Sequence, residues 1–155
     1  MAIRKVARMG HPVLREKARE YTRDEILSPA TKAFVLDLIE TMEEYGGIGI
    51  AAPQVHESRS IALIDYQDDS EEADDGTEGV EKEAVPLTVV INPKITVLDE
   101  TKQGYWEGCL SVPEIRGLVY RPRKVQIDFL DLNAEPQTII AEGFLATVFQ
   151  HELDH

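Results

Sequence analysis

The chain lacks most of the features on which secreted and membrane proteins depend. It contains 1 cysteine in 155 residues, so no disulfide can form within the chain and folding does not require an oxidising compartment. No apolar run approaches the roughly 20 residues that cross a bilayer, and residues 1–12 lack the apolar stretch of a secretory signal. We therefore expect a cytoplasmic protein that does not bind membranes.

Basic residues are scarce as well. The chain has 16 lysines and arginines against 29 acidic residues, which gives a formal net charge of −13. Nonspecific nucleic-acid binding is driven by lysine and arginine side chains that neutralise phosphates, so we expect no direct nucleic-acid binding. Residues 68–83 alone hold nine acidic side chains and one lysine, with almost no apolar content. This composition predicts a solvated, flexible insertion, with a docking loop for a basic partner as the alternative.

Two segments have the apolar spacing of helices. Hydrophobic residues make up 43% of the chain and charged residues 29%, which is typical of a globular protein. Ser28 and Pro29 suit the start of a helix that Gly46 and Gly47 can end, and apolar residues recur along it at spacing four. The segment that follows Gly143 has helical spacing again.

Between these helices lie short runs with the composition of strands. They cover residues 60–65, 87–98, 124–132 and 138–142, and a hairpin turn around Asn133 joins the last two. A chain of 155 residues suffices for one hydrophobic core. We therefore expect a single α+β domain over residues 1–155, with antiparallel β-sheets packed around a C-terminal helix and with an N-terminal helix.

The segment QHELDH, residues 150–155, carries the clearest chemical signal. Positions i and i+4 of a helix lie one above the other, so His151 and His155 can bind one metal ion. Glu152 points about a quarter turn away, where it can act as a general base toward a water molecule at the ion. A solvent-facing helix end is the alternative, but the apolar residues upstream favour burial, and buried imidazoles need partners.

Two imidazoles do not complete a hydrolytic metal site, so a third ligand is needed. Because the sequence ends at His155, the patterns that place this ligand downstream do not apply, and we expect it upstream. The candidates are His11, His56, an acidic side chain and Cys109. Thiolate is the strongest of these ligands for zinc or ferrous iron, and the surroundings of the two other histidines are typical of surface turns. We favour Cys109, with a small buried hydrophobe as the alternative reading of a lone cysteine.

Three stretches with chemical content follow one another along the chain: GIGIAAPQ (47–54), EGCLS (107–111) and QHELDH (150–155). In this order and spacing they resemble the peptide deformylase family, as do GHPVLR near the N-terminus and GFLATV before the last motif. The resemblance covers essentially the whole chain. It implies a metal-dependent hydrolase that removes the N-formyl group from the N-terminal formylmethionine of nascent polypeptides and releases formate.

The resemblance also implies a metal site and a base. Cys109, His151 and His155 would bind one divalent ion, with Fe²⁺ as the physiological metal and Zn²⁺, Ni²⁺ or Co²⁺ compatible with the same ligands. Hydroxide generated at the metal would attack the formyl carbon, because a divalent ion lowers the pKa of a bound water. Glu152 would be the general acid and base.

Further residues are assigned by the same resemblance. Gln54 and the backbone N–H of Leu110 would donate hydrogen bonds to the developing oxyanion. The bound peptide would contact a second group of residues: Ile48, Gly49, Tyr105, Glu107, Arg116, Phe144, Thr147 and Val148. For Phe144 and Val148 a place in the core explains their residue types equally well, and Arg116 can be a plain exposed charge.

Two other functions are compatible with parts of the sequence. A metallopeptidase of another class is disfavoured by the cysteine ligand and the oxyanion donors, and a non-catalytic peptide-binding relative by the intact Glu152 and Gln54. Ile50 stands where the family has leucine, a conservative change. From the end at His155 we expect no C-terminal extension for ribosome docking and only transient ribosome proximity. We also expect a monomer. A viral member of the family would act in the cytosol of an infected host cell.

Overall fold

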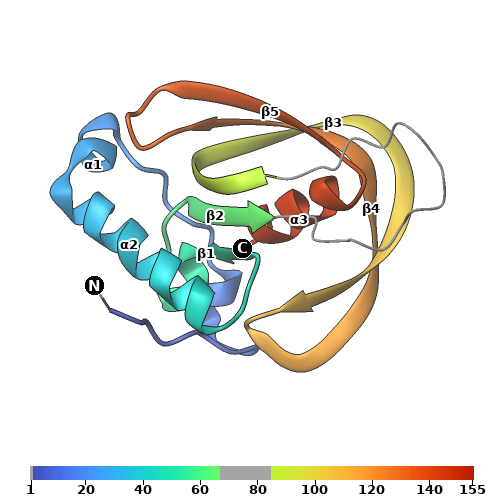
Figure 1. Cartoon of the computed structure of the whole chain (residues 1–155), viewed down its shortest axis with the longest axis horizontal. Helices are drawn as coiled ribbons and strands as arrows, with labels where there is room; N and C mark the ends of the chain where they lie inside the picture. The colour runs from blue at the N-terminus through green and yellow to red at the C-terminus, as the bar shows by residue number, and fades with distance from the viewer. Residues whose placement is uncertain (1, 67–84) are drawn as a thin grey trace.

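The computed structural model describes residues 2–66 and 85–155, so the insertion predicted at 68–83 lies outside the described residues. The described part contains five strands in one antiparallel sheet of order β1-β2-β3-β4-β5, together with three α-helices and two 3₁₀ turns (Figure 1). The elements are η1 (Pro12–Arg15), α1 (Arg23–Leu27), α2 (Pro29–Glu44), β1 (Gly49–Ala51), η2 (Ala52–Val55), β2 (Ile61–Tyr66), β3 (Val85–Cys109), β4 (Val112–Leu130), β5 (Pro136–Glu142) and α3 (Phe144–Leu153). The predicted α+β class is confirmed, with one sheet in place of several.

Helix α2 begins and ends where the sequence predicts. The Ser28 hydroxyl accepts a hydrogen bond from the N–H of Thr31, as an N-cap residue does. Gly46 follows the helix with a left-handed φ of 67°, which glycine adopts without strain. The sequence prediction missed α1, whose start is marked by a capping box between Thr22 and Glu25.

The largest departure from the prediction is the length of β3 and β4. Strands were expected at 87–98 and 124–132, but β3 continues to Cys109 and β4 begins at Val112. The intervening residues pair across the hairpin, for example Tyr105 with Val119. Such pairing depends on the partner strand, which local sequence patterns do not reveal. The hairpin therefore carries the EGCLS motif at its tip.

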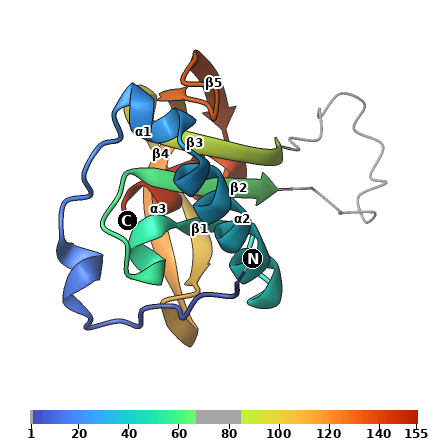
Figure 2. The same cartoon turned by 90° about the vertical axis from the view of Figure 1, so that its left-hand side faces the viewer.

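Strand β2 separates the two halves of the core. Ile61 and Leu63 pack in one cluster with α2, whereas Ile64 packs in a second cluster with α3. Alternate residues of a strand point to opposite faces, so both faces of β2 are buried. Figure 2 shows β2 crossing the middle of the molecule with α2 in front of it.

Helix α3 lies beneath β2 and is enclosed by the long β3–β4 hairpin (Figure 1). Its apolar residues, including the fully buried Phe149, pack on the sheet. The opposite side of its last turns therefore faces β1 and the hairpin tip. In the described part of the chain, no helix is long and apolar enough to cross a membrane.

Candidate metal centre and peptide pocket

Cys109, His151 and His155 converge on one point at the end of α3. The three atoms that they can offer to a metal all lie within 4.8 Å of one another. Sγ of Cys109 is 3.4 Å from Nε2 of His155, and the two imidazole rings are 5.3 Å apart between centroids. The hairpin tip thus brings a thiol to two imidazoles that lie more than forty positions later in the chain. These are the three residues that the sequence suggested as ligands.

The protonation equilibria in this cluster favour a thiolate. Burial raises the pKa of Cys109, but hydrogen bonds from His151, His155 and the Ser111 N–H outweigh it and lower the pKa to about 5. The hydrogen bond to Cys109 raises the pKa of His151 to about 9 against the effect of burial. A thiolate is the form of cysteine that binds metals. A His₂Cys donor set fits zinc or ferrous iron.

Glu152 lies beside this cluster and is 6% exposed. Burial raises the pKa of its carboxyl group to about 7, although the two imidazoles lower it. Its Oε2 is buried and has no hydrogen-bond partner among residues 2–66 and 85–155. Buried polar atoms normally have a partner, so this oxygen fits a site that also holds a metal ion and its water.

Gly49 provides the space for the Glu152 side chain. A Cβ atom added at Gly49 would lie 2.6 Å from Oε1 of Glu152, far inside van der Waals contact. The sequence prediction placed Gly49 among the substrate contacts, and in the structure it lies directly against the carboxylate. Glycine at this position allows β1 to approach α3 closely.

Gln54 points its side-chain amide into the same cluster and is 1% exposed. The N–H of Ala51 donates to its Oε1 at 2.9 Å, which orients the amide. Its Nε2 then lies 3.3 Å from Oγ of Ser111 and 3.5 Å from Sγ of Cys109. Leu110 occupies the turn between these two residues. The predicted oxyanion donors therefore come from two segments that meet at the thiol.

Glu107 orients one of the imidazoles. Its Oε1 is 2.9 Å from Nδ1 of His151, which leaves Nε2 of that ring for the cluster. Arg121 holds the carboxylate through two bonds of 2.7 and 3.0 Å and also reaches Oδ2 of Asp154 at 2.6 Å. Burial raises the pKa of Glu107, but the bonds from Arg121 and His151 outweigh it and lower the pKa below its usual range. A carboxylate on the far nitrogen of a ligand histidine fixes its orientation and tautomer.

The sequence analysis missed Arg121 as a site residue. Its distance from Glu107 depends on the register of the hairpin, in which Gln103 pairs with Arg121 and Glu107 with Gly117. The side chains of Glu107 and Arg121 therefore lie on the same face of the hairpin, toward α3. No local pattern around Arg121 indicates this pairing.

A small cavity of about 80 Å³ opens next to His151 and Glu152. Its walls include five of the residues expected to bind the peptide: Ile48, Glu107, Phe144, Thr147 and Val148. Trp106 and Gly108 also line it and were not predicted. Tyr105 lies behind the wall, with its ring 5.3 Å from that of Phe144. Arg116 pairs with Gly108 on the outer part of the hairpin and does not line the cavity.

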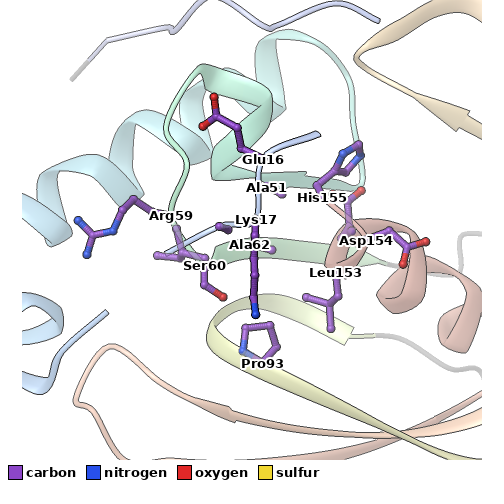
Figure 3. A pocket seen from close by; sticks show the side chains of 13 residues that line it. Glu16, Lys17, Ala51, Arg59, Ser60, Ala62, Pro93, Leu153, Asp154 and His155 are labelled. Carbon is purple, nitrogen blue, oxygen red and sulfur yellow. The ribbon is translucent and has the colours of Figure 1, made fainter. Parts of the chain in front are cut away.

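A larger cavity of about 220 Å³ lies on the other side of the end of α3 (Figure 3). Lys17 extends across it toward Pro93, and Asp154 and His155 form one wall. The side chain of Arg59 points away from it. None of the residues predicted to bind the peptide lines this cavity.

The fold and this site define the class of the protein. A half-buried thiol, two imidazoles on a helix and an adjacent carboxylate, whose Oε2 has no partner in the described part of the chain, are the parts of a metal-dependent enzyme. Comparison with known proteins identifies the family within this class. The sequence profile of the family described as "Polypeptide deformylase" matches residues 3–155. The chain therefore belongs to the polypeptide deformylase family, whose members are metalloenzymes.

Individual relatives agree with this assignment. The chain is 38% identical to a peptide deformylase of Leptospira biflexa, with 100% of this chain and 83% of the relative covered. It is 40% identical to a peptide deformylase of Finegoldia magna, with 100% and 85% covered. A crystal structure of a class I type b peptide deformylase from Acinetobacter baumannii with Met-Ala-Ser bound superposes with a TM-score of 0.87. In that comparison the identity is 30%, and 99% of this chain and 92% of the other are covered.

Proposed function

We propose that this enzyme removes the N-formyl group from formylmethionyl peptides and releases formate and a free N-terminal amine. The observation that carries the proposal is the convergence of Cys109, His151 and His155 beside the unpartnered Oε2 of Glu152. Family membership supports the same reaction. The relative with Met-Ala-Ser bound carries a peptide that begins with the residue expected after deformylation.

The chain supplies three ligands for one divalent ion, namely Cys109, His151 and His155. When bound there, such an ion supplies Lewis-acid activation of water, which makes attack on a poorly electrophilic formamide feasible near neutral pH. Glu107 and Arg121 hold one imidazole in its orientation. Fe²⁺ is our proposal for the physiological metal, with Zn²⁺, Ni²⁺ and Co²⁺ as ions that the same ligands can hold.

Glu152 is proposed to move the protons of the reaction. It accepts a proton from the attacking water as the new C–O bond forms at the formyl carbon. It then donates this proton to the amine nitrogen as the C–N bond breaks, so that formate and the free amine leave. A pKa raised to about 7 by burial suits a group that must both accept and donate a proton near neutral pH.

Gln54 and the Leu110 N–H are proposed to stabilise the negative charge on the formyl oxygen. The Gln54 amide is preorganised, because the Ala51 N–H holds its oxygen and Nε2 is directed at Cys109. Donors that are fixed before the reaction need no reorganisation as charge develops, and removal of one such donor costs about 10²–10³ in kcat.

The small cavity is proposed to hold the methionine side chain. Its apolar wall of Ile48, Phe144 and Val148 suits an unbranched thioether. Strand β1 stands at the end of the strand order, so the peptide beyond methionine can add to this edge by backbone pairing. We expect a monomeric cytoplasmic enzyme with transient ribosome proximity and no nucleic-acid contact.

The test is formate release from formyl-Met-Ala by the purified protein. The protein is prepared without oxygen, analysed for metal, and assayed as isolated and after loading with Fe²⁺, Zn²⁺, Ni²⁺ or Co²⁺. We expect formate and free Met-Ala, with acetyl-Met-Ala as the control substrate that is not turned over. Cleavage of the Met–Ala bond would identify a peptidase, and binding without turnover under every metal would identify a peptide-binding protein.

A further inference from the structure

The N-terminal segment Val6–Met9, here named the N-terminal strap, joins two distant parts of the site. The backbone N–H of Ala7 donates to the carbonyl of Gln54 at 2.6 Å, and the N–H of Met9 donates to the carbonyl of Ser111 at 2.8 Å. Gln54 belongs to η2, whereas Ser111 lies in the turn between β3 and β4. In Figures 1 and 2 the dark-blue N-terminal trace passes below β1 and beside the tip of the β3–β4 hairpin.

The strap is fixed on both sides of these two bonds. Upstream, the N–H of Ala2 donates to Oδ1 of Asp37 on α2 at 2.8 Å, and the side chain of Val6 is 6% exposed. Downstream, the ring of His11 meets that of His56 edge-on, with centroids 4.6 Å apart. A segment held at both ends can act as a spacer of constant length between the groups it contacts.

Ser111 connects the strap to the hairpin side of the site. Its N–H donates to the thiol of Cys109, and its Oγ accepts from Nε2 of Gln54 at 3.3 Å. Met9 holds the carbonyl of the same residue. A rotation of this turn would therefore break the bond from Met9 and would move the neighbouring Leu110 N–H.

Gln54 is held from both of its ends in a similar way. The strap binds its backbone carbonyl through Ala7, and the N–H of Ala51 binds its side-chain Oε1 at 2.9 Å. Ala7 and Met9 are two residues apart, and their N–H groups bind one carbonyl in each of the two segments that carry the proposed oxyanion donors. One short strap therefore contacts both segments, whereas among the described residues the Arg8 N–H makes no backbone hydrogen bond to either of them.

We propose that the N-terminal strap is a positioning element for catalysis. The backbone N–H groups of Ala7 and Met9 set the separation between the Gln54 amide and the Leu110 N–H, and so the fit of both donors to the formyl oxygen. This inference rests on the proposed function for its consequence in turnover. A misplacement of about 1 Å at a reacting centre can lower the rate by about 10²-fold, so two bonds far from the peptide can matter for kcat.

The experiment replaces single residues of the full chain by their α-hydroxy analogues, which changes a backbone N–H into an ester oxygen and keeps the side chain. Esters at Ala7 and Met9 remove the two strap bonds. An ester at Arg8 is the first control. An ester at Met9 also makes the Arg8 carbonyl a weaker hydrogen-bond acceptor, and this carbonyl accepts a bond from the His11 N–H. An ester at His11 removes that bond directly and is therefore the second control.

We expect the esters at Ala7 and Met9 to lower kcat for formyl-Met-Ala about tenfold each. KM and metal content should stay near those of the unmodified enzyme, since the small cavity and the three ligands keep their own contacts. The two control esters should keep kcat within about twofold. A fall in kcat that the controls share to the same degree would overturn the proposal.

A double-mutant cycle separates positioning from general stability. In the Gln54→Ala background the ester at Ala7 should lower kcat no further, because the amide that it positions is absent. The melting temperature should still fall by the same amount as in the unmodified background. An undiminished tenfold effect without Gln54 would show that the strap does not act through this residue.

A second measurement does not depend on turnover. In ¹⁵N spectra of the zinc-loaded protein, the ester at Ala7 should shift or broaden the side-chain amide of Gln54, and the ester at Met9 the backbone amide of Leu110. Unchanged signals would overturn the strap proposal even in an active enzyme. Shifted signals in a protein that releases no formate would uphold the strap and refute only the proposed reaction.

Discussion

Two cavities flank the last turns of α3, and they differ in the side chains that line them. The larger, of about 220 Å³, has charged side chains such as Lys17 and Asp154 in its wall. The smaller, of about 80 Å³, is walled by Ile48, Phe144 and Val148. Size alone would select the larger cavity as the substrate site, but an apolar side chain gains free energy only from an apolar wall.

The proposed general acid and base, Glu152, lies between the two cavities. Glu152 lines both, His155 lines the larger and His151 the smaller. The two imidazoles are supported differently, because His151 is bonded to the Glu107 carboxylate that Arg121 holds. This difference supports the proposal that the side of α3 with the smaller cavity binds the peptide. Substitutions on the two sides should therefore have unequal effects.

The largest effect is expected for a substitution of Glu152, which lines both cavities. Glu152→Gln keeps the shape of the side chain and removes its ability to take up a proton from water. Loss of general acid–base catalysis should lower kcat about 10³-fold, and the metal should remain bound. Metal content and formate release measure the two quantities separately. Loss of the metal in this variant would mean that Glu152 is itself a ligand.

Filling each cavity tests the comparison directly. Val148→Phe places a larger side chain in the small cavity and should lower kcat/KM for formyl-Met-Ala by about 10²-fold. Ser60→Phe fills part of the large cavity and should leave kcat/KM unchanged. Melting temperatures identify any folding defect. The variant Val148→Ala, which enlarges the small cavity, should accept a formyl peptide with a bulkier first residue. Equal effects of Val148→Phe and Ser60→Phe would break the comparison.

Gly49→Ala tests how closely the position of Glu152, which lines both cavities, must be kept. The added Cβ would lie 2.6 Å from Oε1 of Glu152, so the carboxylate must move, and kcat should fall about tenfold. Gly117→Ala is the matched control, because its Cβ would have nothing within 4 Å. Formate assays on both variants with equal metal loading give the result. Equal activities would mean that Glu152 tolerates displacement.

The last prediction concerns the support of His151 and affects metal binding rather than kcat. Arg121→Ala removes the two hydrogen bonds that Glu107 accepts from Arg121. Because Glu107 then holds His151 less firmly, metal binding should weaken roughly tenfold. Arg123→Ala on the same strand is the control, since Arg123 pairs with Glu142 at the surface. Metal affinity is measured by competition with a chelator. An unchanged affinity in Arg121→Ala would mean that the two sides of α3 hold their imidazoles equally well.

The elements that the sequence predicted correctly depend on interactions between neighbouring residues, and the elements that it missed depend on interactions between distant segments. Helix α2 was predicted with its ends, because the cap at Ser28 and the glycine at Gly46 act within one turn of the helix. Strand β1 and the outer half of the β3–β4 hairpin were missed. Their pairing partners lie elsewhere in the chain, and the short segment Gly49–Ala51 has no alternation of its own.

The candidate site divides in the same way. Spacing within one helix suggested His151, Glu152 and His155, and the chemistry of thiolate pointed to Cys109. The role of Arg121 could not be predicted, because it acts through a cross-strand register.

The sequence by itself determined which chemical groups the protein has and which of them share a helix turn, since the positions i and i+4 are fixed by helix geometry. Only the tertiary structure decided that a thiol at a hairpin tip meets these imidazoles and that a strap near the N-terminus spans Gln54 and Ser111. It also decided that the smaller of two cavities has the apolar wall. These features depend on strand register and packing between distant segments, which no local pattern specifies.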